Sequence, residues 1–199
     1  MSEKIVVCLE KGGARDMAEA FSRRTNTPIS EKPGDHLTVL FNSKGVSLTG
    51  YGLAYQGDFE NMLHRVTNGR LQHEMLVRAS KSEKPGRKAI DATAGMGEDG
   101  FLLAAQGYEV TLYEQNPVIA VLLKDALRRA KKHPVLKEIA ARMKLEPQCS
   151  QETDLFDAAI SADPDKIIVK RPLKSDFLAG RKPSYTLSGK AIRYDCYTL

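Results

Sequence analysis

The residues that most suggest a functional site are two acids, each at the end of a predicted strand. Asp91 ends a short apolar strand that begins near Lys88, and Glu114 ends the next predicted strand, residues 109–113. A glycine-rich turn, residues 95–100, follows the first acid. In open α/β sheets, ligands bind outside the carboxyl ends of the strands. The sequence therefore predicts a nucleotide-like cofactor at this edge.

The glycine turn allows two kinds of cofactor. Gly95, Gly97 and Gly100 match G-x-G-x-x-G, the fingerprint of dinucleotide sites. However, Glu98 and Asp99 place negative charge at the start of the following helix, where a diphosphate would have to bind. A cationic sulfonium and an ammonium group suit such a turn better. The pattern therefore favours S-adenosylmethionine.

Each acid then has an expected role. Glu114 would accept hydrogen bonds from the ribose hydroxyls, while Asp91 and the glycine turn would hold the methionine end. The alternative is that the glycines only form a tight turn and the acids only cap helices. That alternative explains the turn but does not explain acids at two consecutive strand ends.

The neighbouring residues predict the elements that position these acids. Residues 101–106 form an apolar helical stretch that Gly107 ends. Residues 118–129 repeat apolar side chains at helical spacing after Pro117, whose missing N–H suits a first helical turn. Together these features predict a β-turn-α-β-α unit of a Rossmann-like sheet.

A smaller unit is expected ahead of this sheet. Residues 4–9 are predicted to form a strand and residues 14–24 a helix, followed by strands at 36–42 and 45–49 that form a hairpin. A polar, mostly helical stretch follows, with a turn near Asn68 and a helix over residues 70–80. We predict three units, namely a β-α-β-β subdomain (1–57), a basic helical connector (58–87) and the cofactor-binding domain (88–199).

The core sequence resembles one known family. Residues 91–127, DATAGMGEDGFLLAAQGYEVTLYEQNPVIAVLLKDAL, are similar to the core of the bacterial small-subunit ribosomal RNA guanine-N2 methyltransferases of the J type. Two further matches are KIIVKRP at 166–172 and SGKAIRYDCY at 188–197. The resemblance implies a cytoplasmic class I methyltransferase that uses S-adenosylmethionine. Its substrate would be the N2 amine of a guanine in ribosomal RNA or in the small ribosomal subunit.

The resemblance and the residue pattern together give a set of candidate site residues. Cys149 and Ser150 stand where the family has a small pair near the adenine. Nine residues are expected to bind the cofactor: Asp91, Gly95, Gly97, Glu98, Asp99, Glu114, Gln115, Cys149 and Ser150.

Basic residues outside this set are candidates for binding RNA phosphates. His64, Arg65 and Arg70 belong to a basic stretch of the connector, and Lys170 and Arg171 follow a predicted strand on the cofactor edge. Arginine and lysine supply affinity for the phosphate backbone without reading sequence. A solvated helix face for the first three, and a structural ion pair for the last two, are the alternatives.

One expected motif is missing. The family holds and stacks its target base with a D-P-x-(F/Y)-P motif after the fourth strand, and this chain has no such motif. Asp163-Pro164 precedes a strand instead of following one, so the catalytic residues are unknown from this sequence. Roughly 30–45 residues are expected between Ser150 and Gln151. Either the sequence joins two segments across a loop, or the chain is a shortened relative. We favour the first, because a central strand is hard to remove from a parallel sheet.

Composition adds weaker constraints. The 199 residues carry a net charge of +5 and a pI near 9.0, which suit a nucleic-acid partner without requiring one. Three widely spaced cysteines predict neither a metal site nor a disulfide framework, and no apolar run is long enough for a membrane span. An NAD(P)-dependent oxidoreductase and a non-catalytic RNA-binding or assembly factor stay open as alternatives.

Overall fold

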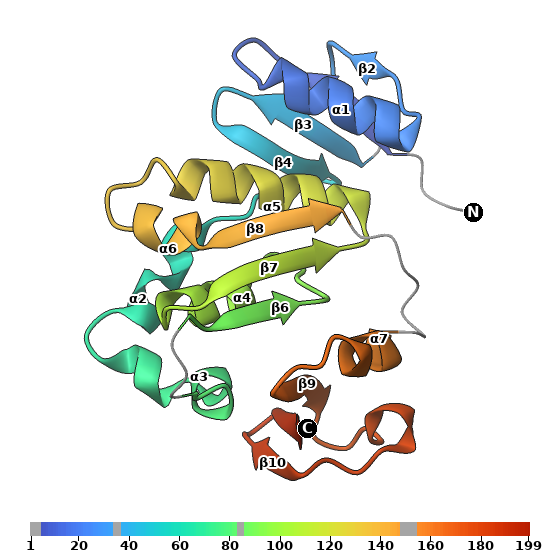
Figure 1. The fold of residues 1–199 in the computed structure, drawn as a ribbon. Coiled ribbons are helices and arrows are strands. Elements are labelled where there is room, and N and C mark those ends of the chain that lie inside the picture. Colours follow the sequence, from blue (N-terminus) through green and yellow to red (C-terminus); the bar gives the residue numbers. More distant parts are fainter. Residues whose placement is uncertain (1–4, 34–36, 83–85, 148–154) are drawn as a thin grey trace.

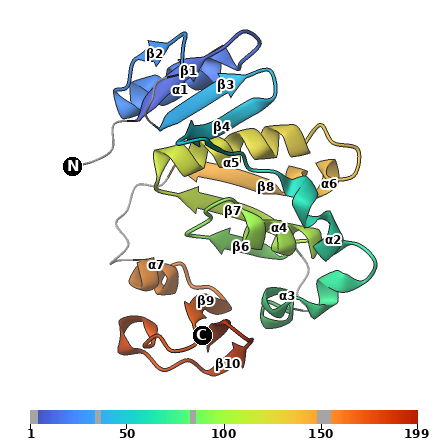
Figure 2. The same ribbon diagram turned by 180° about the vertical axis from the view of Figure 1, so that it is seen from behind.

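The computed structural model describes residues 5–33, 37–82, 86–147 and 155–199, whose strands form three sheets (Figure 1). Opposite views both place the long helix α5 (Pro117–Ala130) between the N-terminal sheet and a parallel sheet (Figure 2). The C-terminal sheet lies on the far side of the parallel sheet. The α/β class expected from the sequence is confirmed.

The N-terminal sheet has five strands in the order β2-β1-β3-β4-β5. Strand β1 pairs in parallel with β2 and β3, whereas β3-β4 and β4-β5 are antiparallel. The predicted hairpin is β3-β4, and the short strands β2 and β5 were not predicted. The strand bounds are Val6–Leu9, Ile29–Ser30, Thr38–Asn42, Gly45–Gly50 and Leu53–Tyr55.

Helix α1 (Arg15–Thr25) covers this sheet with Met17, Ala18 and Phe21. The same hydrophobic cluster contains Val118, Val121 and Leu122 of α5. The opposite side of α5 contributes Leu123, Ala126 and Leu127 to the main cluster around the parallel sheet. One helix therefore contributes side chains to two hydrophobic cores.

The parallel sheet has the order β6-β7-β8, with bounds Lys88–Asp91, Glu109–Glu114 and Met143–Pro147. Helix α4 (Glu98–Ala105) connects the first two strands, and α5 with α6 (Lys137–Ala141) connects the last two. Asp91 lies opposite Leu112 in the register, and Glu114 lies opposite Pro147. The predicted β-turn-α-β-α unit is present, and its strand carboxyl ends share one edge.

The connector differs from the expected helix over residues 70–80. It consists of short pieces: a 3-10 turn (Phe59–Met62), α2 (Leu63–Val66), a second 3-10 turn (Arg70–His73) and α3 (Met75–Ala79). Asn68 and Gly69 both have positive φ, which matches the predicted turn. The continuous helix was wrong because Glu74 is extended, with ψ of 129°.

The closing segment contains α7 (Leu155–Ser161) and a sheet of order β10-β11-β9, in which both pairings are antiparallel. The bounds are Lys166–Pro172 for β9, Tyr185–Ser188 for β10 and Ile192–Thr198 for β11. The central strand β11 is continuously buried from Arg193 to Tyr197. The Arg193 Nε–Asp195 Oδ1 distance of 2.9 Å pairs the two charges within it.

Candidate functional site

The glycine turn forms a close connection between β6 and α4. Gly97 has a φ of 78° and precedes the first residue of α4. A Cβ at Gly97 would lie 2.8 Å from Leu123 Cδ1, and one at Gly100 would lie 2.5 Å from Leu112 Cδ2. Both distances are shorter than the contacts that Cβ atoms make in protein structures. A side chain at either position would therefore require the neighbouring leucine to move. Gly95 has positive φ and open space around it.

Glu114 holds this turn against the end of β7. The residue is buried, with 8% of its surface exposed. Oε2 accepts a hydrogen bond of 2.8 Å from the Gly95 amide, and Oε1 accepts one of 2.7 Å from the Asn116 amide. A carboxylate oxygen can accept more than one hydrogen bond. The geometry thus leaves capacity for a hydroxyl donor from a ligand.

The environment of the Asp91 carboxyl group disfavours its ionised form. Burial, and then repulsion from Asp99, raises its pKa from 3.8 to about 6. The backbone amides of Thr93 and Gly100 and the Lys170 ammonium act in the opposite direction. A buried carboxylate next to a second acid is stabilised by a cationic partner. This environment suits the positively charged end of a ligand.

Asp99 and Lys170 connect the parallel sheet with the C-terminal sheet. The Lys170 Nζ lies 2.8 Å from Asp99 Oδ2. Arg171 donates from Nη2 to the carbonyl of Asp176 at 3.1 Å. Both side chains therefore have intramolecular partners, which is the structural alternative to the predicted RNA contact.

The basic residues of the connector differ in whether they pair with acidic side chains. Arg65 donates from Nε and Nη2 to the two carboxylate oxygens of Glu74, both at 2.8 Å, and its Nη1 lies 3.8 Å from Glu98. Its hydrogen bond is the main cause that lowers the pKa of Glu74. His64 and Arg70 are exposed. The RNA-binding role of all five basic residues stays a prediction.

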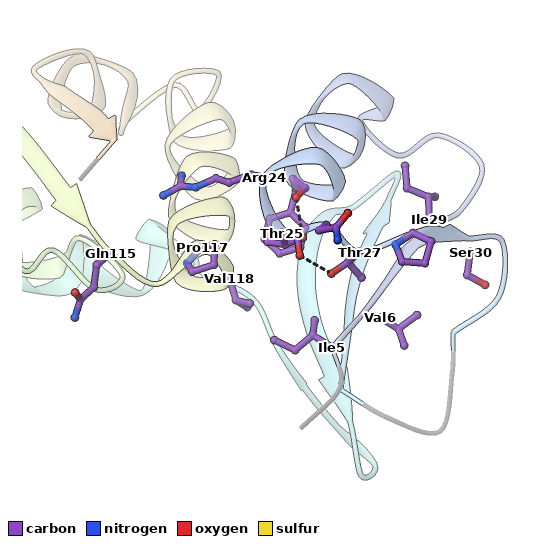
Figure 3. A pocket seen from close by; sticks show the side chains of 13 residues that line it. Ile5, Val6, Arg24, Thr25, Thr27, Ile29, Ser30, Gln115, Pro117 and Val118 are labelled. Atoms are coloured by element: carbon purple, nitrogen blue, oxygen red, sulfur yellow. Dashed lines mark hydrogen bonds between the residues drawn. The ribbon is translucent and has the colours of Figure 1, made fainter. Parts of the chain in front are cut away.

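Most predicted cofactor residues gather at one edge. Asp91, Glu98, Asp99 and Glu114 surround the glycine turn through the contacts given above. Gln115 directly follows Glu114 and lines a neighbouring cavity (Figure 3). Cys149 and Ser150 lie outside the described residues, so their expected role stays a prediction.

The buried acid of α5 was not predicted from the sequence. Asp125 of α5 is fully buried and accepts hydrogen bonds from the Val46 amide (3.0 Å), Arg128 Nη2 (2.7 Å) and Arg129 Nε (2.9 Å). It attaches the N-terminal sheet to α5. The spacing of an acid three and four residues before two arginines is the signal that could have indicated the helical pairs.

Two negative findings apply to the described part of the chain. None of its helices combines the length and apolar character needed to cross a membrane. Within the same residues, no group of three His, Cys, Asp or Glu side chains is arranged to hold a metal ion.

A parallel α/β sheet with a glycine turn and two acids at consecutive strand ends defines a Rossmann-like, nucleotide-cofactor-binding protein. The family model "Putative SAM-dependent methyltransferase" matches residues 36–153 and 148–199. A SAM-dependent methyltransferase from Neisseria gonorrhoeae has the same fold, with a TM-score of 0.74 at 24% identity, covering 98% of this chain and 96% of that one.

Curated relatives define the family more closely. Ribosomal RNA small subunit methyltransferase J of Pseudomonas aeruginosa (strain LESB58) is 30% identical over 238 residues, covering 93% of this chain and 91% of the relative. The protein of the same name from Thioalkalivibrio sulfidiphilus is 31% identical over 241 residues, covering 92% and 93%. The chain belongs to this family of SAM-dependent methyltransferases, and the resemblance seen in the sequence is confirmed.

Proposed function

We propose that this protein transfers a methyl group from S-adenosylmethionine to the exocyclic N2 amine of a guanine in small-subunit ribosomal RNA. The observation that carries the cofactor assignment is the pair of acids at consecutive strand ends around the glycine turn. The substrate assignment is supported by the names of the relatives and by the resemblance of the core, the 166–172 and the 188–197 motifs. The family resemblance also supports a cytoplasmic location.

The chemistry requires mainly alignment. Bound S-adenosylmethionine supplies a methyl carbon that is already electrophilic, because it is attached to a sulfonium. The amine nitrogen would form a bond to this carbon as the carbon–sulfur bond broke, with S-adenosylhomocysteine as the leaving group and the proton of the nitrogen passing to solvent. Proximity and orientation supply most of the acceleration in such a step. A guanine inside a helix would first have to leave its stack.

Within this proposal, the chain's own residues fix the position of the cofactor. Glu114 holds the Gly95 amide and can accept a further donor from a ribose. Asp91 and Asp99 supply negative charge at the turn, where a ligand ammonium would lie. Family membership disfavours the oxidoreductase alternative, in which the same glycines would bind NAD(P).

Calorimetry can test the cofactor site directly. Wild-type protein is titrated with S-adenosylhomocysteine and, separately, with NAD, and we expect only the first to bind. Glu114→Ala should weaken S-adenosylhomocysteine at least tenfold, because hydrogen bonds to a charged group are worth about 1.5–3 kcal/mol each. Glu109→Ala, at the exposed start of the same strand, is the matched control. Tight NAD binding alone would contradict the proposal, and methylation of unmodified small subunits tests the substrate.

We also infer that the residues recognising the base belong to a segment that this sequence lacks between Ser150 and Gln151. The alignments with the relatives extend over 238 and 241 residues, which is more than the 199 residues of this chain. The family model matches in two pieces that meet at 148–153. Both findings support an internal stretch that the relatives have and this sequence does not.

The sheet edges support the same inference. Among the described strands, β6 pairs only with β7, and β9 pairs only with β11. Ile90, in the middle of β6, is 63% exposed. Strands of parallel sheets are normally covered on both faces and rich in buried apolar residues. A further strand beside β6 would bring a crossover connection, and that connection could pack on the face from which this isoleucine projects. The boundaries between the three predicted units of the chain, at 57/58 and 87/88, stay predictions.

A further inference from the structure

A cavity of about 770 Å³ lies between the N-terminal sheet and the first turn of α5 (Figure 3). One wall comes from the end of α1 and the residues that lead into β2. The other wall comes from Gln115, Pro117 and Val118. Its volume falls within the range of about 300–1,000 Å³ that is usual for small-ligand sites.

The cavity is next to the proposed cofactor edge. Gln115 follows Glu114, the acid that closes β7, and Pro117 starts α5. A group bound in the cavity would therefore lie beside the residues that hold the glycine turn. None of the contacts already described for Asp91, Asp99 or Glu114 uses this space.

The lining has the chemistry of a site for one nucleotide. Ile29, Pro117 and Val118 provide apolar surface, while Asn26 and Gln115 carry amides that can both donate and accept hydrogen bonds. Among the lining residues that the structure describes, Arg24 is the only charged side chain, and no acid is present. Arg24 is exposed and extends from α1 toward α5 (Figure 3). An arginine with no acid beside it suits a phosphate.

The polar wall is held in place before any ligand binds. Asn26 ends α1 in a left-handed conformation with φ of 51°, and its backbone N–H donates to the Ser22 carbonyl. The Ser22 hydroxyl donates to the Thr27 carbonyl at 2.6 Å, which closes the turn. A turn fixed in this way loses little conformational freedom on binding.

We propose that this cavity binds a single unpaired nucleotide of the RNA substrate, with its phosphate at Arg24 and its base against the Pro117–Val118 wall. The proposal rests on the proposed function. It gives the N-terminal unit a specific task, which is to hold a nucleotide beside the one that is methylated. Sequence-specific recognition of RNA commonly uses bases that have been splayed out of their helix.

The test compares two neighbouring arginines in the full chain. Arg24→Ala removes the cation of the cavity, whereas Arg23→Ala removes the same charge from an exposed residue that does not line it. Affinity for small-subunit ribosomal RNA transcribed in vitro is measured by filter binding over a range of salt concentrations. We expect Arg24→Ala to weaken binding about five- to tenfold and to reduce the salt slope by about one, with less than a twofold effect for Arg23→Ala.

The outcomes separate this proposal from the proposed function. Equal losses for the two variants would mean only general attraction to RNA and would overturn the nucleotide site. A parallel loss of S-adenosylhomocysteine affinity in Arg24→Ala would assign the cavity to the cofactor and would also overturn it. If the wild-type protein binds S-adenosylhomocysteine but not the RNA, the cavity proposal is wrong and the cofactor site stands. If it binds neither, the proposed function itself fails.

Discussion

Replacing Asp91 with asparagine is expected to stabilise the unliganded protein and to weaken cofactor binding. Burial is the main cause that raises the Asp91 pKa from 3.8 to about 6. A rise of about two pKa units corresponds to about 3 kcal/mol against the ionised form. Asparagine carries no charge and keeps an oxygen for the Thr93 amide. We therefore expect Asp91→Asn to raise the free energy of unfolding at pH 7.5 by about 1–3 kcal/mol.

The pH dependence of stability follows from the same shift. Because the pKa of Asp91 is higher in the folded protein, the unfolded chain releases its proton first. The free energy of unfolding therefore decreases as the pH rises from 3.8 to about 6, and this contribution is constant above that range. Urea unfolding of wild type and Asp91→Asn across this range should show the slope in the first and its loss in the second.

Cofactor binding should change in the opposite direction. A charged Asp91 attracts a ligand ammonium, so wild-type affinity for S-adenosylhomocysteine should fall about tenfold between pH 7.5 and pH 5, one unit below the pKa. Calorimetry with Asp91→Asn should give weaker binding at pH 7.5 and little change with pH. Asp157→Asn, an acid that is 76% exposed, is the control. Unchanged affinity and an unchanged pH profile in Asp91→Asn would refute this account of Asp91.

Two further predictions concern stability and covalent structure. Asp125→Ala should lower the free energy of unfolding in urea by about 3–5 kcal/mol, because it leaves a buried amide and two arginines without their acceptor. Asp157→Ala, which breaks an exposed pair with Arg181, should change it by less than about 1 kcal/mol, and equal effects would contradict the assigned role of Asp125. The intact mass of the natural protein should exceed 22.0 kDa by several kilodaltons, since a segment between Ser150 and Gln151 is expected. A mass of 22.0 kDa would mean that this segment is absent, and the catalytic assignment would then fail.

Local patterns were sufficient to predict the centre of the fold. The acids, the glycines and Pro117 act within a few residues of their own elements, so β6, α4, β7 and α5 could be placed from sequence. Helix α4 was predicted only from Phe101, because residues up to Gly100 were assigned to the glycine turn, whereas the helix starts at Glu98. The short strand β5 was missed, since Leu53 and Tyr55 are exposed and show no burial pattern.

Contacts between distant residues limited the prediction of the site. The connector helix failed at Glu74, whose extended backbone accompanies its pairing with Arg65. Lys170 looked available for RNA because its partner, Asp99, is 71 residues away in the chain. Tertiary pairing of this kind leaves no periodic signal in the sequence.

Helix α5 has a consequence for how the protein folds. Val118, Val121 and Leu122 belong to one hydrophobic cluster, and Leu123, Ala126 and Leu127 belong to the other. Neither hydrophobic cluster is complete without this helix. If one cluster comes apart, α5 loses part of its packing, and the other cluster is weakened because it depends on the same helix. We therefore expect the two sheets on either side of α5 to unfold together, so that melting of the N-terminal sheet also lowers the stability of the cofactor edge.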